Sequence, residues 1–237
     1  MGDPRRLVPL FRWSVAASKS RMTVTFFQDY PIPTPPSRPR TPQFIPPPWV
    51  AAPRYELPAV VPVGQFIHKS PTFVVAIEAA KVYSTGCVFE MSWMLRRTDQ
   101  DDRRWSEMNG VFHRPAPHLR DGAISVASVL LFGMQFPDGT KASTSSLAMY
   151  EQSVPRDQEP GGPVFEFRPR GGNGGEDDMS AMGTLWLWPL PPAGDLRLLA
   201  QWTSMGMPES SIVLDGSRLR AAAAAVQQYS PEEVGPE

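Results

Sequence analysis

The sequence predicts a mainly β protein: an antiparallel β-sandwich of about 7-8 strands with one C-terminal helix, preceded by a proline-rich arm. Short apolar runs with the two-residue period of β-strands recur after residue 63, and clusters of glycine, proline, aspartate and serine separate them. Helical patterns do not alternate with these runs, as they would in a parallel α/β fold. We therefore expect an N-terminal extension and linker over residues 1–62 and a β-sandwich domain with the helix over residues 63–237.

The first 21 residues carry Arg5 and Arg6 before a short apolar run that Pro9 interrupts. This run is too short to span a bilayer and is a poor match to a signal peptide. A more protein-like segment begins at Met22, so the ordered protein is expected to begin at Met22 or later. The sequence leaves two alternatives for the start of translation, Met1 and Met22.

Proline dominates the next segment, residues 30–63, which holds 12 of the 28 prolines in the chain. Because proline lacks an amide donor and restricts its backbone, this segment is predicted to lack regular secondary structure and to form a semi-rigid arm. Its P-x-x-P spacings are also those of ligands for aromatic-lined grooves. The alternative is a linker whose Phe44, Ile45 and Trp49 fold back onto the domain.

The domain is expected to open with two long strands. Residues 73–83 form one apolar run, and a Ser-Thr-Gly turn follows it. In the next strand, residues 87–95, the odd positions from Cys87 to Leu95 are apolar and predict the core face, while the even positions predict the opposite face. The charged residues 98–104 that come next are predicted to be a solvated loop.

Three further stretches in the middle of the chain have strand character. Residues 124–136 form a long apolar run that ends at a Pro-Asp-Gly-Thr turn, and residues 141–146 can return as a polar edge strand. Residues 164–168 alternate between apolar and charged side chains. The glycine-rich and acidic residues 171–178 match no phosphate-binding motif and are predicted to be a mobile loop.

The C-terminal part has the clearest succession of elements. Residues 185–188 and 196–202 are predicted strands, and the proline-rich connection between them indicates an antiparallel hairpin. A short third strand covers residues 212–214. Asp215 or Ser217 can then cap a helix, because the apolar residues that follow have the spacing of one buried helix face: Leu219, Ala222, Ala223 and Val226.

Composition argues against several classes of partner and site. A formal net charge of −1 over 237 residues gives no electrostatic reason to bind nucleic acid or an acidic membrane. Cys87 is the only cysteine, so one chain can form neither an internal disulfide nor a thiolate metal cluster, and a reducing, cytoplasmic location fits best. No motif indicates a cofactor.

Histidine and tryptophan are the residue types that could form a site. His113 and His118 are five residues apart in a proline-broken segment, a spacing that disfavours a metal site and is typical of a surface loop. Trp186 and Trp188 lie in a strand with apolar groups on both faces, so at least one of them is expected to reach an outer face. An exposed tryptophan there would bind a partner protein or stack on a sugar.

The segment WPLPPAGDLRLLAQWTSMGMPES combines the proline-rich connection, a tryptophan after the second strand and a Gly-Met-Pro-Glu sequence. In these features the chain resembles uncharacterised β-rich proteins of actinobacteria, mainly over residues 185–225. The resemblance implies a β-rich fold and a bacterial source, and it implies no particular activity or site residue.

These observations favour a cytoplasmic binding or accessory module that acts through protein–protein contacts and without catalysis. Two alternatives are retained. A hydrolase would assemble its site from distant aspartate, glutamate and histidine residues, although the sequence has no G-x-S-x-G motif. A carbohydrate-binding protein would use an exposed Trp186 or Trp188.

Overall fold

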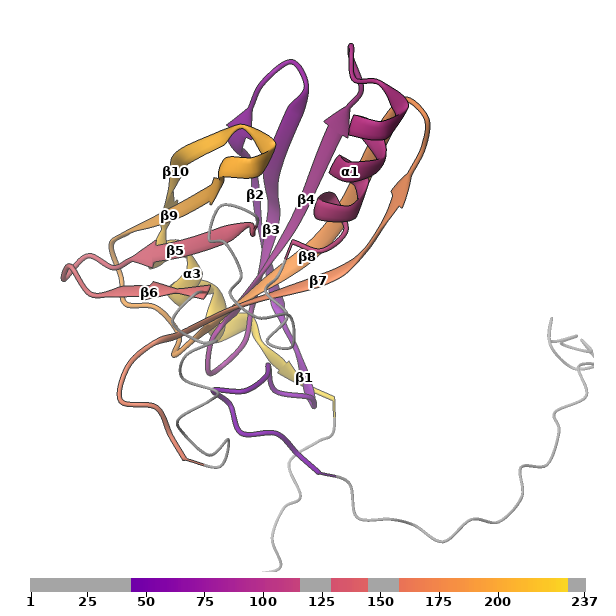
Figure 1. The fold of residues 1–237 in the computed structure, drawn as a ribbon. Coiled ribbons are helices and arrows are strands. Elements are labelled where there is room, and N and C mark those ends of the chain that lie inside the picture. The colour runs from indigo at the N-terminus through magenta and orange to yellow at the C-terminus, as the bar shows by residue number, and fades with distance from the viewer. Residues whose placement is uncertain (1–43, 116–128, 145–157, 230–237) are drawn as a thin grey trace, which may run out of the picture. The chain divides into compact units, whose positions relative to one another are not determined.

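Antiparallel β-strands make up most of the structure, so the prediction of a mainly β fold is confirmed (Figure 1). The computed structural model describes residues 44–115, 129–144 and 158–229, which all belong to one unit. The larger sheet has five strands, in the order β2 (Ala59–Lys69), β3 (Phe73–Val82), β4 (Cys87–Arg96), β8 (Asp178–Trp188) and β7 (Val164–Gly174). The second sheet has four, in the order β10 (Met207–Asp215), β9 (Asp195–Trp202), β5 (Leu131–Gln135) and β6 (Lys141–Ser143). Two short strands, β1 (Glu56–Leu57) and β11 (Gln227–Gln228), pair separately.

Apolar side chains from the two larger sheets form one hydrophobic core. The ring of Phe73 in β3 meets that of Trp202 in β9 edge-on, with the ring centroids 5.8 Å apart. Phe132 in β5 lies 5.1 Å from Phe167 in β7, measured in the same way. At the margins of the sheets, β10 lies beside β2 and β6 lies beside β7. The core therefore lies between the two sheets.

The register predicted for β4 is confirmed. Its odd positions from Cys87 to Leu95 are buried, and Trp93 is only 2% exposed, while its even positions are half-buried or exposed. β3 pairs with one edge of β4 and β8 with the other. Alternation identified the core face because successive side chains of a strand point to opposite faces of the sheet.

The hairpin predicted between residues 185–188 and 196–202 is wrong. Both segments are strands, but β8 belongs to the five-stranded sheet and β9 to the four-stranded one. The proline-rich connection, which ends at Gly194 with a φ of 113°, carries the chain from one sheet to the other. β9 pairs instead with β10, where Leu199 lies opposite Ser211. Prolines indicate that a strand ends, and they do not indicate which strand the chain pairs with next.

The charged segment 98–104, predicted to be a solvated loop, contains the start of helix α1 (Asp102–Phe112). Asp101 caps this helix, because its carboxylate accepts a hydrogen bond of 2.7 Å from the backbone amide three residues later. Two residues of the helix are buried, seven positions apart on one face: Trp105 and Phe112. Met108 and Val111 also pack against the core, so the apolar residues of this segment have helical spacing, which the prediction of a solvated loop from its charged start overlooked.

The glycine-rich segment 171–178, predicted to be a mobile loop, is mostly strand. β7 continues to Gly174 and β8 begins at Asp178, which leaves residues 175–177 as the turn between them. Gly174 lies against α1, since a Cβ added there would be 2.8 Å from Nδ2 of Asn109. Glycine weakens a strand, but at this position it allows the helix to approach the sheet closely.

The predicted C-terminal helix is present and is shorter than its apolar pattern. α3 (Gly216–Ala222) follows Asp215, whose carboxylate accepts a hydrogen bond of 3.0 Å from the amide three residues later. Leu219 packs into the core. A 3₁₀ turn, Ala223–Ala225, comes next, and Val226 then adopts extended backbone. The last two residues of the predicted apolar face therefore lie beyond the α-helix.

The strands predicted in the middle of the chain are confirmed in part: residues 129, 130 and 136 lie outside β5, residue 144 lies outside β6, and residues 164–168 belong to β7. β5 covers the end of the run 124–136, the turn predicted at residues 137–140 follows it, and β6 returns beside it at the edge of the sheet. Residues 124–128 and 145–146, which belong to the same two predictions, lie outside the described residues.

The proline-rich arm is described from Phe44 onward. β2 begins at Ala59, inside the segment 30–63 that was predicted to lack regular secondary structure. Its Pro62 is compatible with a strand because β2 is at the edge of the sheet, where an amide donor is not required. Trp49 packs against the end of β8, as expected of an arm that folds back, whereas Phe44 is 79% exposed. The rest of the arm and both candidate start methionines lie outside the described residues.

We expect Trp93→Ala to lower the free energy of unfolding by about 3–5 kcal/mol, because it empties a core position that contacts Phe112 and Phe167. Urea-induced unfolding followed by circular dichroism measures this loss. Ser92→Ala, at the neighbouring half-buried position, is the control and should change the same quantity by less than about 0.5 kcal/mol. A larger loss for Ser92→Ala than for Trp93→Ala would contradict the register of β4.

Candidate functional site

An apolar cleft lies at the end of β8, where Trp188 is the last residue of the strand. Its volume is about 390 Å³, and three loops from separate parts of the chain line it with Trp188. These are the turn after β5, which begins at Phe136, the residues before β7 that end at Pro163, and the connection after β8 that includes Leu190. The cleft therefore combines aromatic, proline and leucine side chains.

The loops that form the cleft are conformationally restricted. In the turn between β5 and β6, the carboxylate of Asp138 accepts a hydrogen bond of 2.9 Å from the amide of Thr140, and this bond lowers the pKa of Asp138. Gly139 has a φ of 86°, a conformation that favours glycine. The other two loops contain the five prolines that line the cleft. The ring of each proline restricts its own φ angle.

Trp188 is half-buried, and part of its surface lines the cleft. The ring of Trp49 packs edge-on against it, with the ring centroids 6.0 Å apart. Arg168, further along β7, donates a hydrogen bond to the carbonyl oxygen of Val50 and so ties the same segment to the sheet. The arm thus supports the indole of Trp188 on one side.

Trp186, the other tryptophan singled out from the sequence, is only 2% exposed. The ring of Tyr83 packs edge-on against it at 6.2 Å, and burial raises the pKa of Tyr83. A Cβ on Gly86 would lie 2.6 Å from the indole of Trp186, so glycine makes room for the ring. Trp186 therefore contributes to packing, and of these two tryptophans Trp188 is the one available to a ligand.

The histidines do not join Trp188 in one site. His113 caps the C-terminal end of α1, with its ring edge-on to Phe112 at 5.1 Å, beside the β7–β8 turn. Trp188 lies at the opposite end of the eleven-residue strand β8, roughly 30 Å away. His68 is in β2, where desolvation lowers its pKa. His118 lies outside the described residues.

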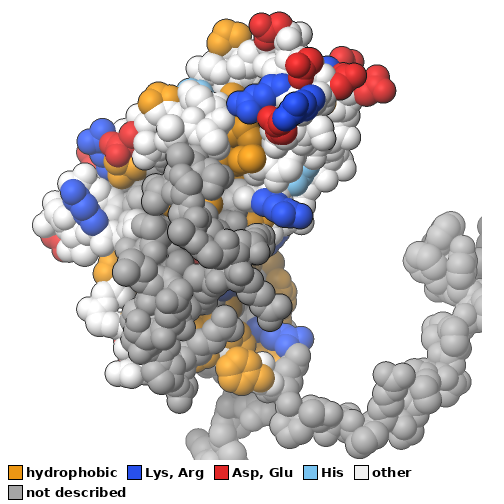
Figure 2. Space-filling model, viewed as in Figure 1, with side chains coloured by type: hydrophobic (Ala, Val, Ile, Leu, Met, Phe, Trp, Pro, Cys, Tyr) orange, Lys and Arg blue, Asp and Glu red, His pale blue; other side chains and the backbone are white. Residues whose placement is uncertain are grey.

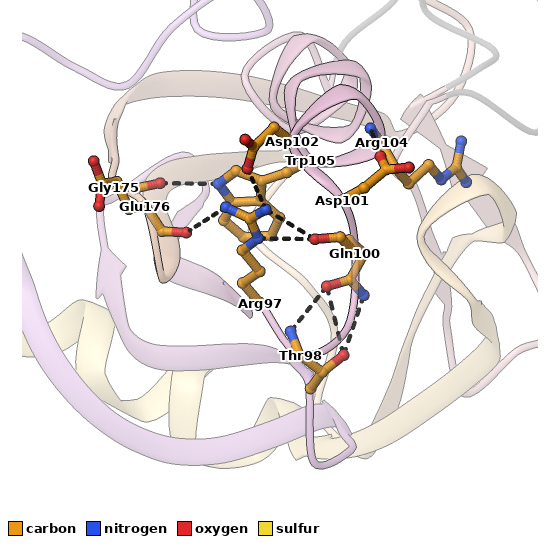
Figure 3. Close-up of polar contacts among 9 residues, drawn as sticks. All are labelled: Arg97, Thr98, Gln100, Asp101, Asp102, Arg104, Trp105, Gly175 and Glu176. Carbon is orange, nitrogen blue, oxygen red and sulfur yellow. Dashed lines mark hydrogen bonds and ion pairs between the residues drawn. The ribbon is translucent and has the colours of Figure 1, made fainter.

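A second group of polar contacts surrounds Arg97, which directly follows β4 (Figure 3). Its guanidinium donates to the carbonyl oxygen of Gln100 from Nε at 3.0 Å and from Nη2 at 2.9 Å. Nη2 also lies 2.6 Å from the carboxylate of Asp102, and Nη1 donates to the carbonyl oxygen of Glu176 at 3.4 Å. The ring of Trp105 lies 5.7 Å from the guanidinium carbon. Sequence reasoning missed this cluster because the charged residues 98–104 were predicted to be a solvated loop and because Glu176 lies 79 residues after Arg97.

The Arg97 cluster fixes α1 to the sheet. It joins the loop after β4, the first turn of α1 and the turn between β7 and β8, and Nε1 of Trp105 adds a hydrogen bond of 3.0 Å to the carbonyl oxygen of Gly175. Acidic and basic side chains gather together at this end of the molecule (Figure 2). Because the acceptors of the guanidinium are groups of the protein itself, the cluster positions the helix and does not present a free cation.

Cys87 is a buried core residue at the start of β4. Burial raises the pKa of its thiol to about 12, so the thiol is neutral at physiological pH. A nucleophilic cysteine requires the thiolate form and access for a substrate. The cysteine therefore serves the core, as its place in the strand pattern predicts.

No protein-family model, curated protein or solved structure matches this chain. In the part of the chain that the structure describes, no helix is long and apolar enough to cross a membrane, and no three histidine, cysteine, aspartate or glutamate side chains are grouped to hold a metal ion. The geometry of the Trp188 cleft is therefore the basis for a functional assignment.

We expect Arg97→Gln to lower the free energy of unfolding by about 0.5–1.5 kcal/mol, because the half-buried carbonyl oxygen of Gln100 loses two hydrogen bonds and the exposed acceptors of Asp102 and Glu176 lose one each. Hydrogen exchange of the amides in residues 98–112 should accelerate, since the start of α1 is released from the β7–β8 turn. Arg103→Gln is the matched control, because the side chain of Arg103 is 89% exposed. Unchanged exchange in Arg97→Gln would show that the helix is held without the cluster.

The Cys87 thiol should resist Ellman's reagent in the native protein at about pH 8, because it is buried and protonated. The reagent is expected to label Cys87 only in molecules that have unfolded. The unfolded thiol ionises near its ordinary pKa of 9.0 and the folded thiol only near about 12, so this group makes stability fall as pH rises through that interval. Rapid labelling of the native protein would contradict the burial of Cys87.

Proposed function

We propose that the protein is a cytoplasmic binding or accessory module that acts without catalysis and holds a proline-rich segment of a partner protein in the cleft beside Trp188. The observation that carries this proposal is the half-buried indole of Trp188 on a cleft with apolar walls. Aromatic-lined grooves bind proline-rich peptides, whose extended conformation is largely formed before binding and loses little entropy. The single cysteine, buried and reduced, is consistent with a cytoplasmic location.

The chemistry of the cleft favours a proline-rich segment over a sugar. Phe136, Leu190 and the prolines offer apolar contacts to pyrrolidine rings. A sugar needs several hydrogen-bonding side chains beside the aromatic ring. Of the residues that line this cleft, only Asp138, Thr140 and Trp188 carry a polar side-chain group, and the first two belong to the same tight turn.

A hydrolase is supported less well by the geometry. Its general base would be a histidine hydrogen-bonded to a carboxylate in a pocket. Within the described residues, no hydrogen bond joins His68 or His113 to a carboxylate, and Cys87 is buried and protonated. The cleft with the half-buried Trp188 lies at the other end of β8 from His113.

We also infer that the two larger sheets are the layers of an antiparallel β-sandwich. The contacts of Phe73 with Trp202 and of Phe132 with Phe167, which cross from one sheet to the other, support this arrangement. In a sandwich the loops gather at the two ends of the sheets, and binding sites are common there because loops vary without disturbing the core. The loops around Trp188 are such a cluster.

A fluorescein-labelled peptide of ten prolines should bind the full chain, and fluorescence polarisation measures its affinity. We expect Trp188→Ala to weaken binding at least tenfold, because a stacked aromatic contact contributes about 1.4 kcal/mol or more. Phe66→Ala is the matched control, since Phe66 is an aromatic residue 52% exposed on β2, away from the cleft. The control variant should bind as the unchanged protein does.

Three results would overturn the proposed function. The first is the absence of binding to the proline peptide at concentrations up to about 1 mM. The second is equal binding of a glycine-serine peptide of the same length, which would show that proline is not recognised. The third is quenching of the Trp188 fluorescence by an oligosaccharide and not by the peptide, which would assign the cleft to a sugar.

A further inference from the structure

A separate groove lies on the outer face of the four-stranded sheet. Its volume is about 510 Å³, and it is lined by residues of β5, β6 and β9 together with Glu209 of β10. Leu131 and Leu199 are half-buried on this outer face, although the pattern of β9 places its other leucines in the core. The groove thus has an apolar floor with polar side chains around it.

Gly133, in the middle of β5, leaves the groove open. It has no positive φ, so its backbone does not require glycine. A Cβ added to it would lie 3.8 Å from the Leu199 side chain, which is an ordinary contact, so packing does not require glycine either. Glycine in a strand interior often marks a place where another molecule approaches the backbone closely.

Two cations flank this open position. The ladder places Lys141 of β6 and Arg197 of β9 directly opposite Gln135 of β5, one on each side. Adjacent strands are about 4.8 Å apart, so the two cationic residues are roughly 10 Å apart at the backbone, within reach of one ligand for such long side chains. The row Lys141–Gln135–Arg197 therefore presents two positive charges and an amide across three strands.

Neither cation has a carboxylate partner among the described residues. Nε of Arg197 donates to Oγ of Ser211 at 3.0 Å, which orients the guanidinium and leaves its two Nη groups for a ligand. By contrast, Lys81 is paired with Glu90 on the outer face of the other sheet. Unpaired guanidinium and ammonium groups beside an amide favour a carboxylate or phosphate.

We propose that the groove binds a small organic anion. Arg197 and Lys141 hold its carboxylate or phosphate, Gln135 donates to it from between them, and the apolar part of the ligand lies over Gly133 and Leu199. Glu209, at the β10 side of the groove, opposes negative charge in the ligand outside its head group and so favours an apolar tail.

The test uses the full chain labelled with nitrogen-15 and three probes: hexanoate, hexyl phosphate and inorganic phosphate. Hexanoate or hexyl phosphate should shift the amide resonances of β5, β6 and β9. The probe that binds with the higher affinity shows whether the groove prefers a carboxylate or a phosphate head group. We expect Arg197→Gln and Lys141→Gln each to weaken this binding about tenfold. Arg218→Gln, which removes an exposed cation on α3, is the matched control and should leave it unchanged.

Gly133→Val tests the shape of the groove without changing its charge. It should abolish hexanoate binding, because the two methyl groups of valine extend into the groove, and the unfolding midpoint should stay close to that of the unchanged protein, because the Cβ itself meets only ordinary contacts. The proposal is overturned if none of the probes shifts the groove resonances up to about 10 mM. It is also overturned if inorganic phosphate binds as tightly as hexanoate, or if Arg197→Gln and Arg218→Gln change the affinity for hexanoate by the same factor.

Discussion

The structure depends on a cluster of aromatic rings that joins the two sheets and helix α1. Phe112 of α1 lies 6.2 Å from Trp202 of β9, with the rings nearly parallel at 22°, and 6.2 Å from Trp93 of β4. Phe73 of β3 completes the cluster with its edge contact to Trp202. Because these rings come from both sheets and the helix, each of the three elements buries part of its apolar face against the other two. Large buried aromatics of this kind dominate the energy of a core.

The positions of two arginines relative to α1 and the sheets explain why they have different roles in this protein. Arg97 lies where α1, the β7–β8 turn and the end of β4 meet, and protein carbonyls and a carboxylate accept its hydrogen bonds. Arg197 lies on the outer face of a sheet that no described helix covers, and its one hydrogen bond, to Ser211, leaves most of its donors free. The first arginine stabilises the fold and the second is available to a ligand.

The two proposed binding sites are adjacent through the β5–β6 hairpin. Phe136 and the turn after it line the cleft at Trp188, while Lys141 and the rest of β6 line the groove on the outer face. The turn itself is held by the hydrogen bond between Asp138 and Thr140. A short, well-defined hairpin at the edge of the sheet thus contributes to both surfaces.

The sequence alone determined those features that depend on neighbours along the chain. Alternation placed Trp93 in the core, because a strand exposes successive side chains to opposite faces whatever it pairs with. Asp215 was one of two residues predicted to cap the last helix, because a capping side chain bonds an amide only three residues later, and the structure shows that Asp215 is the cap. Trp188 was named as a candidate binding residue, but the loops that make its cleft come from three separated segments, so no local pattern could predict the cleft.

Tertiary structure decided the features that depend on distant segments. β8 and β9 entered different sheets because each pairs with strands remote in sequence, and prolines show only where a strand ends. The segment 171–178 became strand because residues 171–174 pair with the start of β8, with Gly174 against α1, and α1 itself is stable because the core accepts Trp105 and Phe112. Trp186 is buried because Tyr83 packs against its ring and because Gly86 leaves room for the indole. Both residues are about a hundred positions earlier in the chain. Burial is a property of the packed structure, so it cannot be predicted from the types and spacing of side chains along one strand.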